Sequence, residues 1–280
     1  MQPDSLDVRD QARIAASQLV ARSGAYTPPC TFVDLVRLAA FLGVDVQCPT
    51  DLGGASGGVM SETVGKDGRA KLVVSVAETG YRGRFTLAHE LGHAAVRISS
   101  PGIGLSPDRE ERFVDAFASH VLLPGSLLSL LLNGIEVLTI DDMLKLSRKA
   151  KVSLSALVSR ISSATDVLWK PRNFILVSKR GLSRMKRENF APRIVAVSGP
   201  KRFYLPTNKR LSKCGLDYLE ARFEASPLFQ KSSVESTLTV YDRDAKAVRA
   251  LALLFEYIFY STADGSRLLV VASEPVDILD

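Results

Sequence analysis

The sequence feature that most constrains this 280-residue chain is a small polar cluster inside an apolar segment, residues 85–96. His89, Glu90 and His93 form the pattern His-Glu-x-x-His there, and the apolar flanks predict a helix. Residues four apart lie on one helix face, so both histidines can reach the same zinc ion. Glu90 follows the first histidine, where a carboxylate can take a proton from a metal-bound water. Because buried polar groups are either paired or bound to a metal, this segment predicts a zinc site. The alternative is a hydrogen-bonded pair of core histidines with a solvated Glu90.

A second predicted helix supplies the carboxylates that such a site needs. It begins at Ser106-Pro107, a typical N-cap and first helical residue. Glu111 and Asp115 lie one turn apart and share a face. A catalytic zinc commonly has three protein ligands and one water, and two histidines with one glutamate form one such set. We therefore predict Glu111 as the third ligand and Asp115 as the acceptor of a ligand histidine's ring N–H.

Two other polar residues of this helix are predicted to lie outside the metal site. Glu110 is the alternative third ligand, but its spacing from Asp115 predicts that it points elsewhere. His120 is nine residues from Glu111, about half a turn round the helix, so it is predicted to face away from the metal and to be structural. The acidic first turn also has a purely structural explanation, since carboxylates are favoured at a helix N-terminus.

Strands are predicted before the metal-binding segment. Residues 44–46 alternate like a strand, and residues 58–64 and 70–76 flank Gly65-Lys66-Asp67-Gly68, a strong hairpin signal. An edge strand beside the zinc helix could take up a peptide by strand addition, and an ordinary half-buried strand is the alternative. The candidate substrate strand consists of Leu72, Val73, Val74 and Ser75.

The first 43 residues predict two packing helices without catalytic features. Apolar residues recur at helical spacing over residues 5–22 and again over residues 31–42. Thr31 is the predicted N-cap of the second helix, with Asp34 three residues later completing a capping box.

Composition excludes several classes of protein. With 46% hydrophobic residues and mixed charge, the chain can bury a core and is not disordered. Its first residues lack the basic and apolar regions of a signal peptide, and the longest apolar run, residues 250–260, is too short to span a bilayer. Three widely spaced cysteines fit a reducing compartment. We expect a cytoplasmic protein that is not bound to a membrane.

Charge is unevenly distributed and suggests three regions. Lys and Arg number 12 against 14 Asp and Glu over residues 1–124, five against four over 125–169, and 19 against 12 over 170–280. We predict an α+β protein with a zinc domain at 1–124, a helical segment at 125–169 and a basic α+β domain at 170–280. A sensory or docking role is the expected function of the last domain.

The helical segment resembles a helix-turn-helix. Thr139 and Asp142 predict the start of one short helix, and Ser153 caps the next after a turn at Lys151-Val152. The functional interpretation is contact with DNA, but the net charge is weak for neutralising phosphates. A structural or repressor-docking element is the alternative.

The basic stretch at 170–213 holds 13 Lys and Arg against one Asp or Glu, with Phe174, Phe190, Phe203 and Tyr204 interleaved. It fits a nucleic-acid surface, solvated strand ends or a surface for an acidic partner, and these alternatives remain open. Beyond it, strands are predicted at 236–241 and 268–272, with a long apolar helix over residues 245–260.

Three sequence blocks together carry a family resemblance. Residues 84–93, 111–115 and 117–124 resemble the ImmA/IrrE family of metallopeptidases, and the likeness extends from about residue 8 to 165. Val114, His120 and Leu123 depart from the residues usual in the family, and none of them belongs to the predicted ligand set.

The resemblance implies a thermolysin-like fold with one Zn²⁺ held by His89, His93 and Glu111, and with Glu90 as the base. It also implies an endopeptidase that cleaves a helix-turn-helix repressor of the XRE type, relieving repression in a stress response, a mobile element or a toxin–antitoxin system. The alternative is a non-proteolytic regulator that binds DNA or a repressor and has a structural or silent zinc site. The sequence assigns no residue to stabilise the oxyanion.

Overall fold

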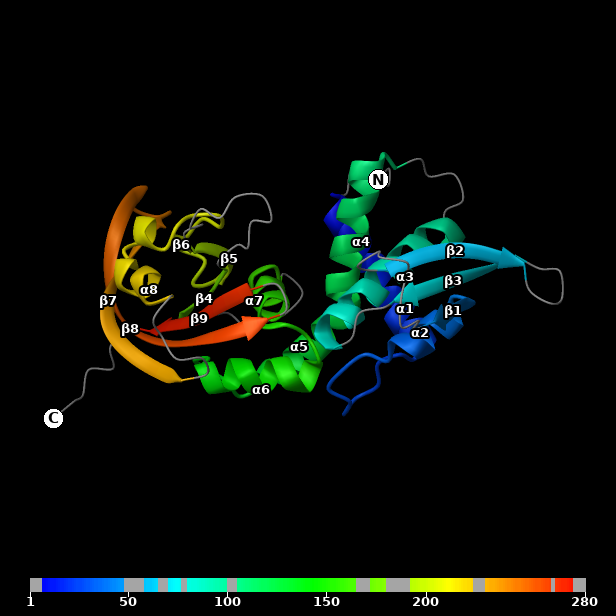
Figure 1. Ribbon diagram of the computed structural model, residues 1–280, viewed down its shortest axis with the longest axis horizontal. Coiled ribbons are helices and arrows are strands. Elements are labelled where there is room, and N and C mark those ends of the chain that lie inside the picture. Colours follow the sequence, from blue (N-terminus) through cyan, green and yellow to red (C-terminus); the bar gives the residue numbers. More distant parts are fainter. Residues whose placement is uncertain are drawn as a thin grey trace. The chain divides into compact units, whose positions relative to one another are not determined.

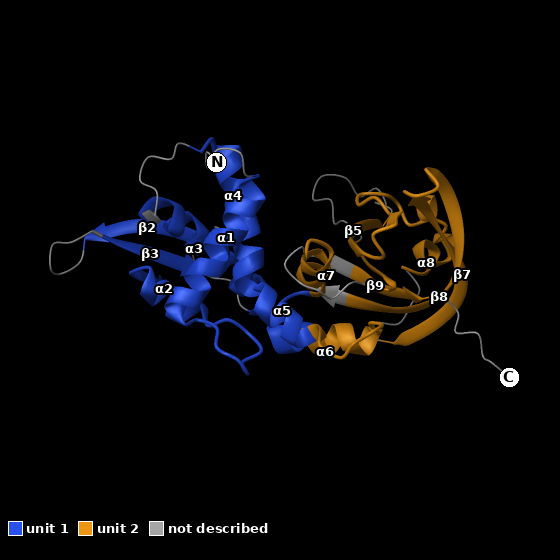
Figure 2. Ribbon diagram, turned by 180° about the vertical axis from the view of Figure 1, so that it is seen from behind, with its two compact units in different colours: residues 1–131, 147–153 blue, residues 132–146, 154–280 orange. Residues whose placement is uncertain are grey.

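The chain divides into two compact units (Figure 2). The N-terminal unit comprises residues 1–131 and 147–153, and the C-terminal unit comprises residues 132–146 and 154–280. The predicted helical segment 125–169 contributes to both units, and the predicted division into three functional regions stays a prediction. The structure, a computed structural model, describes residues 7–47, 58–64, 70–76, 80–99, 105–164, 172–179, 192–223, 230–262 and 265–273.

A small mixed sheet forms one layer of the N-terminal unit (Figure 1). Its strands are β1 (Val44–Gln47), β2 (Gly58–Val64) and β3 (Ala70–Val76), in the order β1-β3-β2. The predicted hairpin is confirmed, since β2 and β3 pair antiparallel from Gly58 opposite Val76 to Val64 opposite Ala70. Its glycine-containing turn, residues 65–68, lies outside the described residues. β3 is the central strand because β1 pairs with its other side in parallel.

Five helices accompany this sheet: α1 (Val8–Ser23), α2 (Leu35–Phe41), α3 (Gly80–Ser99), α4 (Pro107–Leu122) and α5 (Gly125–Leu132). Helix α4 begins as predicted, with Ser106 as N-cap and proline in its first turn. Helix α3 packs against α4 and against β2 and β3, which fixes its polar face beside both elements. None of the described helices is by itself long and apolar enough to span a membrane, and α4 and α5, which qualify only together, meet at a 45° bend.

The predicted start of α2 was wrong. Asp34 is the N-cap, and its carboxylate accepts the backbone N–H groups of Val36 at 3.0 Å and Arg37 at 3.1 Å. A carboxylate immediately before a helix satisfies donors that have no partner within the helix. Thr31 instead donates its hydroxyl to the backbone oxygen of Lys149 at 3.1 Å.

Helices α6 (Ile140–Ala150) and α7 (Leu154–Ser162) form the predicted helix pair. The capping box is confirmed, because Thr139 N–H donates to the Asp142 carboxylate at 3.0 Å and Asp142 N–H donates to the Thr139 hydroxyl at 3.2 Å. The turn between the helices packs within the N-terminal unit. Arg84 of α3 donates to the backbone oxygen of Lys151 at 3.2 Å, and the Lys151 ammonium lies 3.7 Å from the ring centroid of Phe32. This turn is therefore anchored to the helix that carries the histidines.

The C-terminal unit is built on an antiparallel sheet in the order β5-β4-β9-β8-β7-β6 (Figure 1). Helix α7 packs against β4 and β5, while a second core joins the sheet to residues before and within α8. The elements are β4 (Phe174–Lys179), β5 (Arg193–Ser198), β6 (Phe203–Tyr204), a 3-10 turn η2 (Ser212–Cys214), α8 (Asp217–Arg222), β7 (Lys231–Asp242), β8 (Ala247–Thr262) and β9 (Gly265–Ser273).

One predicted helix of this unit is a strand. Residues 245–260 were expected to be helical, but residues 247–262 form β8, paired with β7 on one side and β9 on the other. A continuous apolar run fits both periodicities, so periodicity alone does not separate a buried strand from a buried helix. Alternate side chains decide the outcome, because Leu253, Phe255, Tyr257 and Phe259 all enter the same core. The strands predicted at 236–241 and 268–272 are confirmed.

Candidate metal centre

Two histidines and one glutamate converge between α3 and α4. His89 and His93 lie one turn apart on α3, with ring centroids separated by 5.1 Å. The Glu111 carboxylate of α4 reaches both rings, at 3.5 Å from His89 Nε2 and 3.6 Å from His93 Nε2. One donor atom from each residue lies within 4.8 Å of the others. The structure therefore brings the three predicted ligands together, and their role as ligands stays a prediction.

Carboxylates of α4 contact the Nδ1 atom of both rings, whereas the Nε2 atoms face Glu111. His89 Nδ1 lies 3.0 Å from Asp115 Oδ1, and His93 Nδ1 lies 2.7 Å from Glu110 Oε1. A proton on each Nδ1, donated to these carboxylates, leaves both Nε2 lone pairs directed at Glu111. Two neutral imidazole nitrogens with one carboxylate oxygen form a donor set that suits Zn²⁺. The residues present fit the metal that the sequence predicts.

Glu110 is the site residue whose position was predicted wrongly. It was expected to point elsewhere, yet its carboxylate makes the shorter of the two histidine contacts. The prediction used spacing along α4 alone, whereas the crossing of α3 and α4 decides which carboxylates reach the histidines. His120 does not belong to the cluster formed by the described residues.

The carboxylates also change the protonation of His89. The hydrogen bond to Asp115 is the main cause that raises the pKa of His89, and burial of the ring opposes it. The negative charges of Asp115, Glu111 and Glu90 raise this pKa further. Because a ligand histidine must be neutral, protons compete with a metal ion for this ring.

Gly92 allows the two helices to approach closely. A Cβ atom at Gly92 would lie 3.0 Å from Val114 Cβ and 3.1 Å from Phe117 Cδ1, and both of those side chains are fully buried. Since only glycine lacks a Cβ atom, this position sets the helix separation that places Glu111 opposite the histidines. The sequence showed a glycine inside a predicted helix, but it did not show which helix crosses there.

Glu90 lies against the start of β2. A Cβ atom at Gly58 would lie 2.7 Å from Glu90 Cγ and 2.8 Å from Thr86 Cγ2. The first residue of this strand is thus in contact range of the predicted base, and glycine is the residue that leaves room for it. This role of Gly58 was not predicted.

The predicted substrate strand is not at an edge. Leu72, Val73, Val74 and Ser75 belong to β3, which pairs with β1 through these residues and with β2 on the opposite side. Peptide addition needs a strand with one unpaired side, so this assignment was wrong. Within the described residues, the edge of the sheet beside Glu90 is β2.

The His-His-Glu cluster of α3 and α4 could hold a metal ion, and comparison with known proteins supports a peptidase class. Residues 42–162 match the peptidase M78 family model, described as an IrrE N-terminal-like domain. This match confirms the resemblance to the ImmA/IrrE family seen in the sequence. The comparison with curated proteins gives no match.

A solved structure shows that the likeness of fold extends beyond this region. A Mycobacterium tuberculosis transcriptional regulator is similar with a TM-score of 0.54 and 13% sequence identity. The match covers 95% of this chain and 88% of that one. At this identity the similarity concerns the fold alone.

The predicted basic stretch is only partly described. Lys179, Lys201-Arg202 and Lys209-Arg210 belong to the described residues, whereas Arg180, Arg184, Lys186-Arg187 and Phe190 lie outside them. Arg202 is held by the carboxylate of Asp242 at 2.8 Å. Binding of nucleic acid by this stretch stays a prediction.

Proposed function

We propose that the protein is a cytoplasmic zinc-dependent endopeptidase with His89, His93 and Glu111 as metal ligands. The observation that carries this proposal is the convergence of both Nε2 atoms on one carboxylate, at 3.5 and 3.6 Å. Three protein ligands leave a coordination position for water or substrate, as catalytic zinc sites require. The match of residues 42–162 to the peptidase M78 family supports the same reaction class.

In the proposed hydrolysis of a peptide bond, Glu90, Asp115 and Glu110 have different roles. When bound, zinc supplies Lewis acidity that polarises the scissile carbonyl and lowers the pKa of the attacking water. Glu90, next to His89 in the sequence, takes the proton of that water and passes it to the leaving amine. Asp115 and Glu110 keep the imidazole rings in the orientation that exposes Nε2.

The edge of β2 is the proposed binding place for the substrate backbone. An extended peptide that adds as a strand to Gly58–Val64 gains main-chain hydrogen bonds independently of its sequence. Gly58 lies directly against Glu90 and Thr86, so a peptide along this edge passes the proposed base. The contact of Gly58 with Glu90 therefore supports β2, and not the central strand β3, as the place where the peptide binds.

The proposed substrate is a helix-turn-helix repressor of the XRE type, cleaved to relieve repression. This substrate class rests on the resemblance to the family whose model residues 42–162 match. A non-proteolytic regulator with a structural or silent zinc site is the second candidate, and it is suggested by the name of the matched structure, a transcriptional regulator.

Replacing Glu90 with Gln separates the two functions, because it keeps the side-chain shape and removes the base. The purified chain is incubated with candidate helix-turn-helix repressors of the XRE type, with and without zinc, and the products are resolved by mass. Wild type and the control Asp108→Asn, an exposed position on α4, should cleave only with zinc, and Glu90→Gln should not. Unchanged regulatory output from zinc-loaded Glu90→Gln would instead establish the non-proteolytic regulator.

A further inference from the structure

Two exposed tyrosines lie side by side near the tip of the β7–β8 hairpin. Tyr204 of β6 pairs with Tyr241 of β7, which in turn pairs with Val248 of β8. Directly paired residues of neighbouring strands point to the same face of a sheet. Their exposed fractions are 48%, 41% and 70%, so this face is open to solvent. We call Tyr204, Tyr241 and Val248, together with Arg243, the tyrosine surface.

The sheet face beside the tyrosine surface is flat and uncharged. The next cross-strand pairs are Thr239 with Ala250 and Thr237 with Ala252, all of which have short side chains. The alternate residues Leu238 and Val240 are buried in the core on the opposite face. These strand pairs place no bulky side chain beside the two rings, and the turn at Gly215 lies against Thr237 and Thr239.

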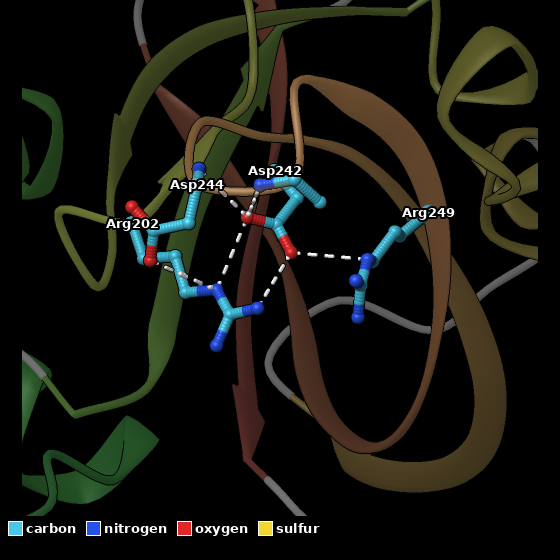
Figure 3. A network of polar contacts seen from close by, with 5 residues as sticks. Arg202, Asp242, Asp244 and Arg249 are labelled. Atoms are coloured by element: carbon cyan, nitrogen blue, oxygen red, sulfur yellow. Dashed lines mark hydrogen bonds and ion pairs between the residues drawn. The ribbon is translucent and has the colours of Figure 1, made fainter.

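Asp242 organises a polar network at the same end of the sheet, on the face opposite the rings, because Asp242 pairs with Phe203 and Arg249 pairs with Val240 (Figure 3). The fully buried Asp242 carboxylate binds Arg202 at 2.8 Å and Arg249 at 3.0 Å, while both arginine side chains stay about half exposed. It also accepts the backbone N–H groups of Asp244 and Ala245 at 3.0 and 3.2 Å. Asp244 in turn lies 3.4 Å from Arg202, so both acidic residues of this network, Asp242 and Asp244, face a guanidinium.

Arg243 is the cation whose contact with the rings is established in the described residues. The Arg243 guanidinium carbon lies 5.8 Å from the ring centroid of Tyr204, and Arg243 N–H donates to the backbone oxygen of Arg202 at 2.9 Å. The two turns at this end of the sheet carry further exposed basic residues, Lys201 and Arg202 before β6 and Lys246 between β7 and β8.

We propose that the tyrosine surface binds single-stranded nucleic acid. Aromatic rings on adjacent strands of an exposed sheet provide stacking platforms for unpaired bases, and nearby cations neutralise the phosphates. Two successive bases stack on Tyr204 and Tyr241, and the backbone follows Lys201, Arg243 and Lys246. A duplex keeps its bases stacked internally, and an acidic peptide offers no planar groups to the rings. This activity belongs to the C-terminal unit and is independent of the proposed peptidase.

Fluorescence anisotropy with the full-length chain tests the proposal. The probes are labelled single strands of RNA and of DNA of about 12 nucleotides, and the corresponding DNA duplex, at about 50 and about 200 mM salt. Single strands should bind more tightly than the duplex and weaken as salt rises. Tighter binding of RNA would identify the ribose hydroxyl as a further contact, and equal binding would identify bases and phosphates alone; either result supports the proposal.

Matched variants make the test specific to the rings. Tyr204→Ala and Tyr241→Ala should each weaken single-strand binding about tenfold, since stacking contributes about 1–3 kcal/mol per base. Tyr204→Phe and Tyr241→Phe keep the rings and should bind like wild type. Tyr81→Ala removes a similarly exposed tyrosine, 40% exposed, from the N-terminal unit and should have no effect.

Three results would overturn the proposal. The first is no saturable binding of either single strand at the lower salt concentration. The second is binding by a folded Tyr204→Ala/Tyr241→Ala double variant that equals wild type, with folding judged by thermal melting. The third is equal affinity for single strands, duplex and heparin, which identifies a general cationic surface.

Discussion

The metal centre and the Asp242 network use carboxylates to orient neighbouring groups with opposite results. At the metal centre, Asp115 and Glu110 hold imidazoles from behind, so the uncharged Nε2 atoms and Glu111 face a common point. At the hairpin tip, buried Asp242 holds two guanidiniums whose side chains remain half exposed. The first arrangement suits a cation and the second suits an anion. Carboxylates hold the neighbouring groups in both places. The ligand class depends on whether the held group is a neutral imidazole or a charged guanidinium.

The largest expected effect is loss of the third ligand. Glu111→Ala leaves two histidines, and a two-ligand site should not retain stoichiometric zinc. Zinc content after dialysis, measured by atomic absorption, should fall from about one ion per chain to near zero. Repressor cleavage should be lost with it. The control Asp108→Asn alters the same helix at an exposed position and should keep both zinc and cleavage. Retention of zinc by Glu111→Ala would rule out the three-ligand site.

The orienting carboxylates should have a smaller effect. Replacing either Asp115 with Asn or Glu110 with Gln keeps the side-chain volume but removes the charge behind one histidine. Each variant should bind zinc about 10–100-fold more weakly, as hydrogen-bond partners of ligand histidines typically contribute. Competition with a chromophoric chelator measures these affinities. An unchanged affinity in both variants would mean that the Nδ1 contacts do not orient the rings.

Gly92→Ala tests whether the metal centre depends on a close helix crossing. The new Cβ atom would lie 3.0 Å from Val114 Cβ, so α3 and α4 must separate slightly. Overpacking in a close-packed core typically costs about 1–3 kcal/mol of unfolding free energy. Urea unfolding should show this loss, and zinc affinity should fall because Glu111 moves with α4. If Gly92→Ala is destabilised but binds zinc as tightly as wild type, the metal centre does not depend on the close crossing of α3 and α4.

The Asp242 network should be visible in the acid dependence of stability. Its hydrogen bond to Arg202 is the main cause that lowers the pKa of Asp242 to about 2. A carboxyl group with a lowered pKa stabilises the fold above its unfolded-state pKa of about 4, and this stabilisation is lost as the pH falls towards 2. Asp242→Asn should therefore unfold at lower urea than wild type at pH about 6, with a smaller difference at pH about 2. Asp244→Asn, at an exposed position, should change less.

Prediction from sequence succeeded where one local pattern determines one structure. The spacing of His89, Glu90 and His93 placed these residues on one helix, and Glu111 with Asp115 followed from a second helical spacing. The capping box at Thr139 and Asp142 and the β2–β3 hairpin were likewise local. Each of these features depends on residues that are close in the sequence.

The failures concern contacts between distant segments. The position of Glu110 depends on how α3 crosses α4, and the central place of β3 depends on pairing with β1. The strand β8 was taken for a helix because its apolar residues are contiguous, and its partners β7 and β9 decide its conformation. Similarly, the contact between Gly58 and Glu90 joins residues 32 positions apart. Spacing along one segment contains no information on such crossings.

The most direct test of the proposed peptidase is a time course of repressor cleavage by zinc-loaded wild type and Glu90→Gln. Loss of a general base typically lowers a rate by about 10²–10⁴-fold, so cleavage by the variant should nearly vanish while its zinc content stays at about one ion per chain. Cleavage at the wild-type rate by zinc-loaded Glu90→Gln would contradict the assignment of Glu90 as the base and, with it, the proposed mechanism.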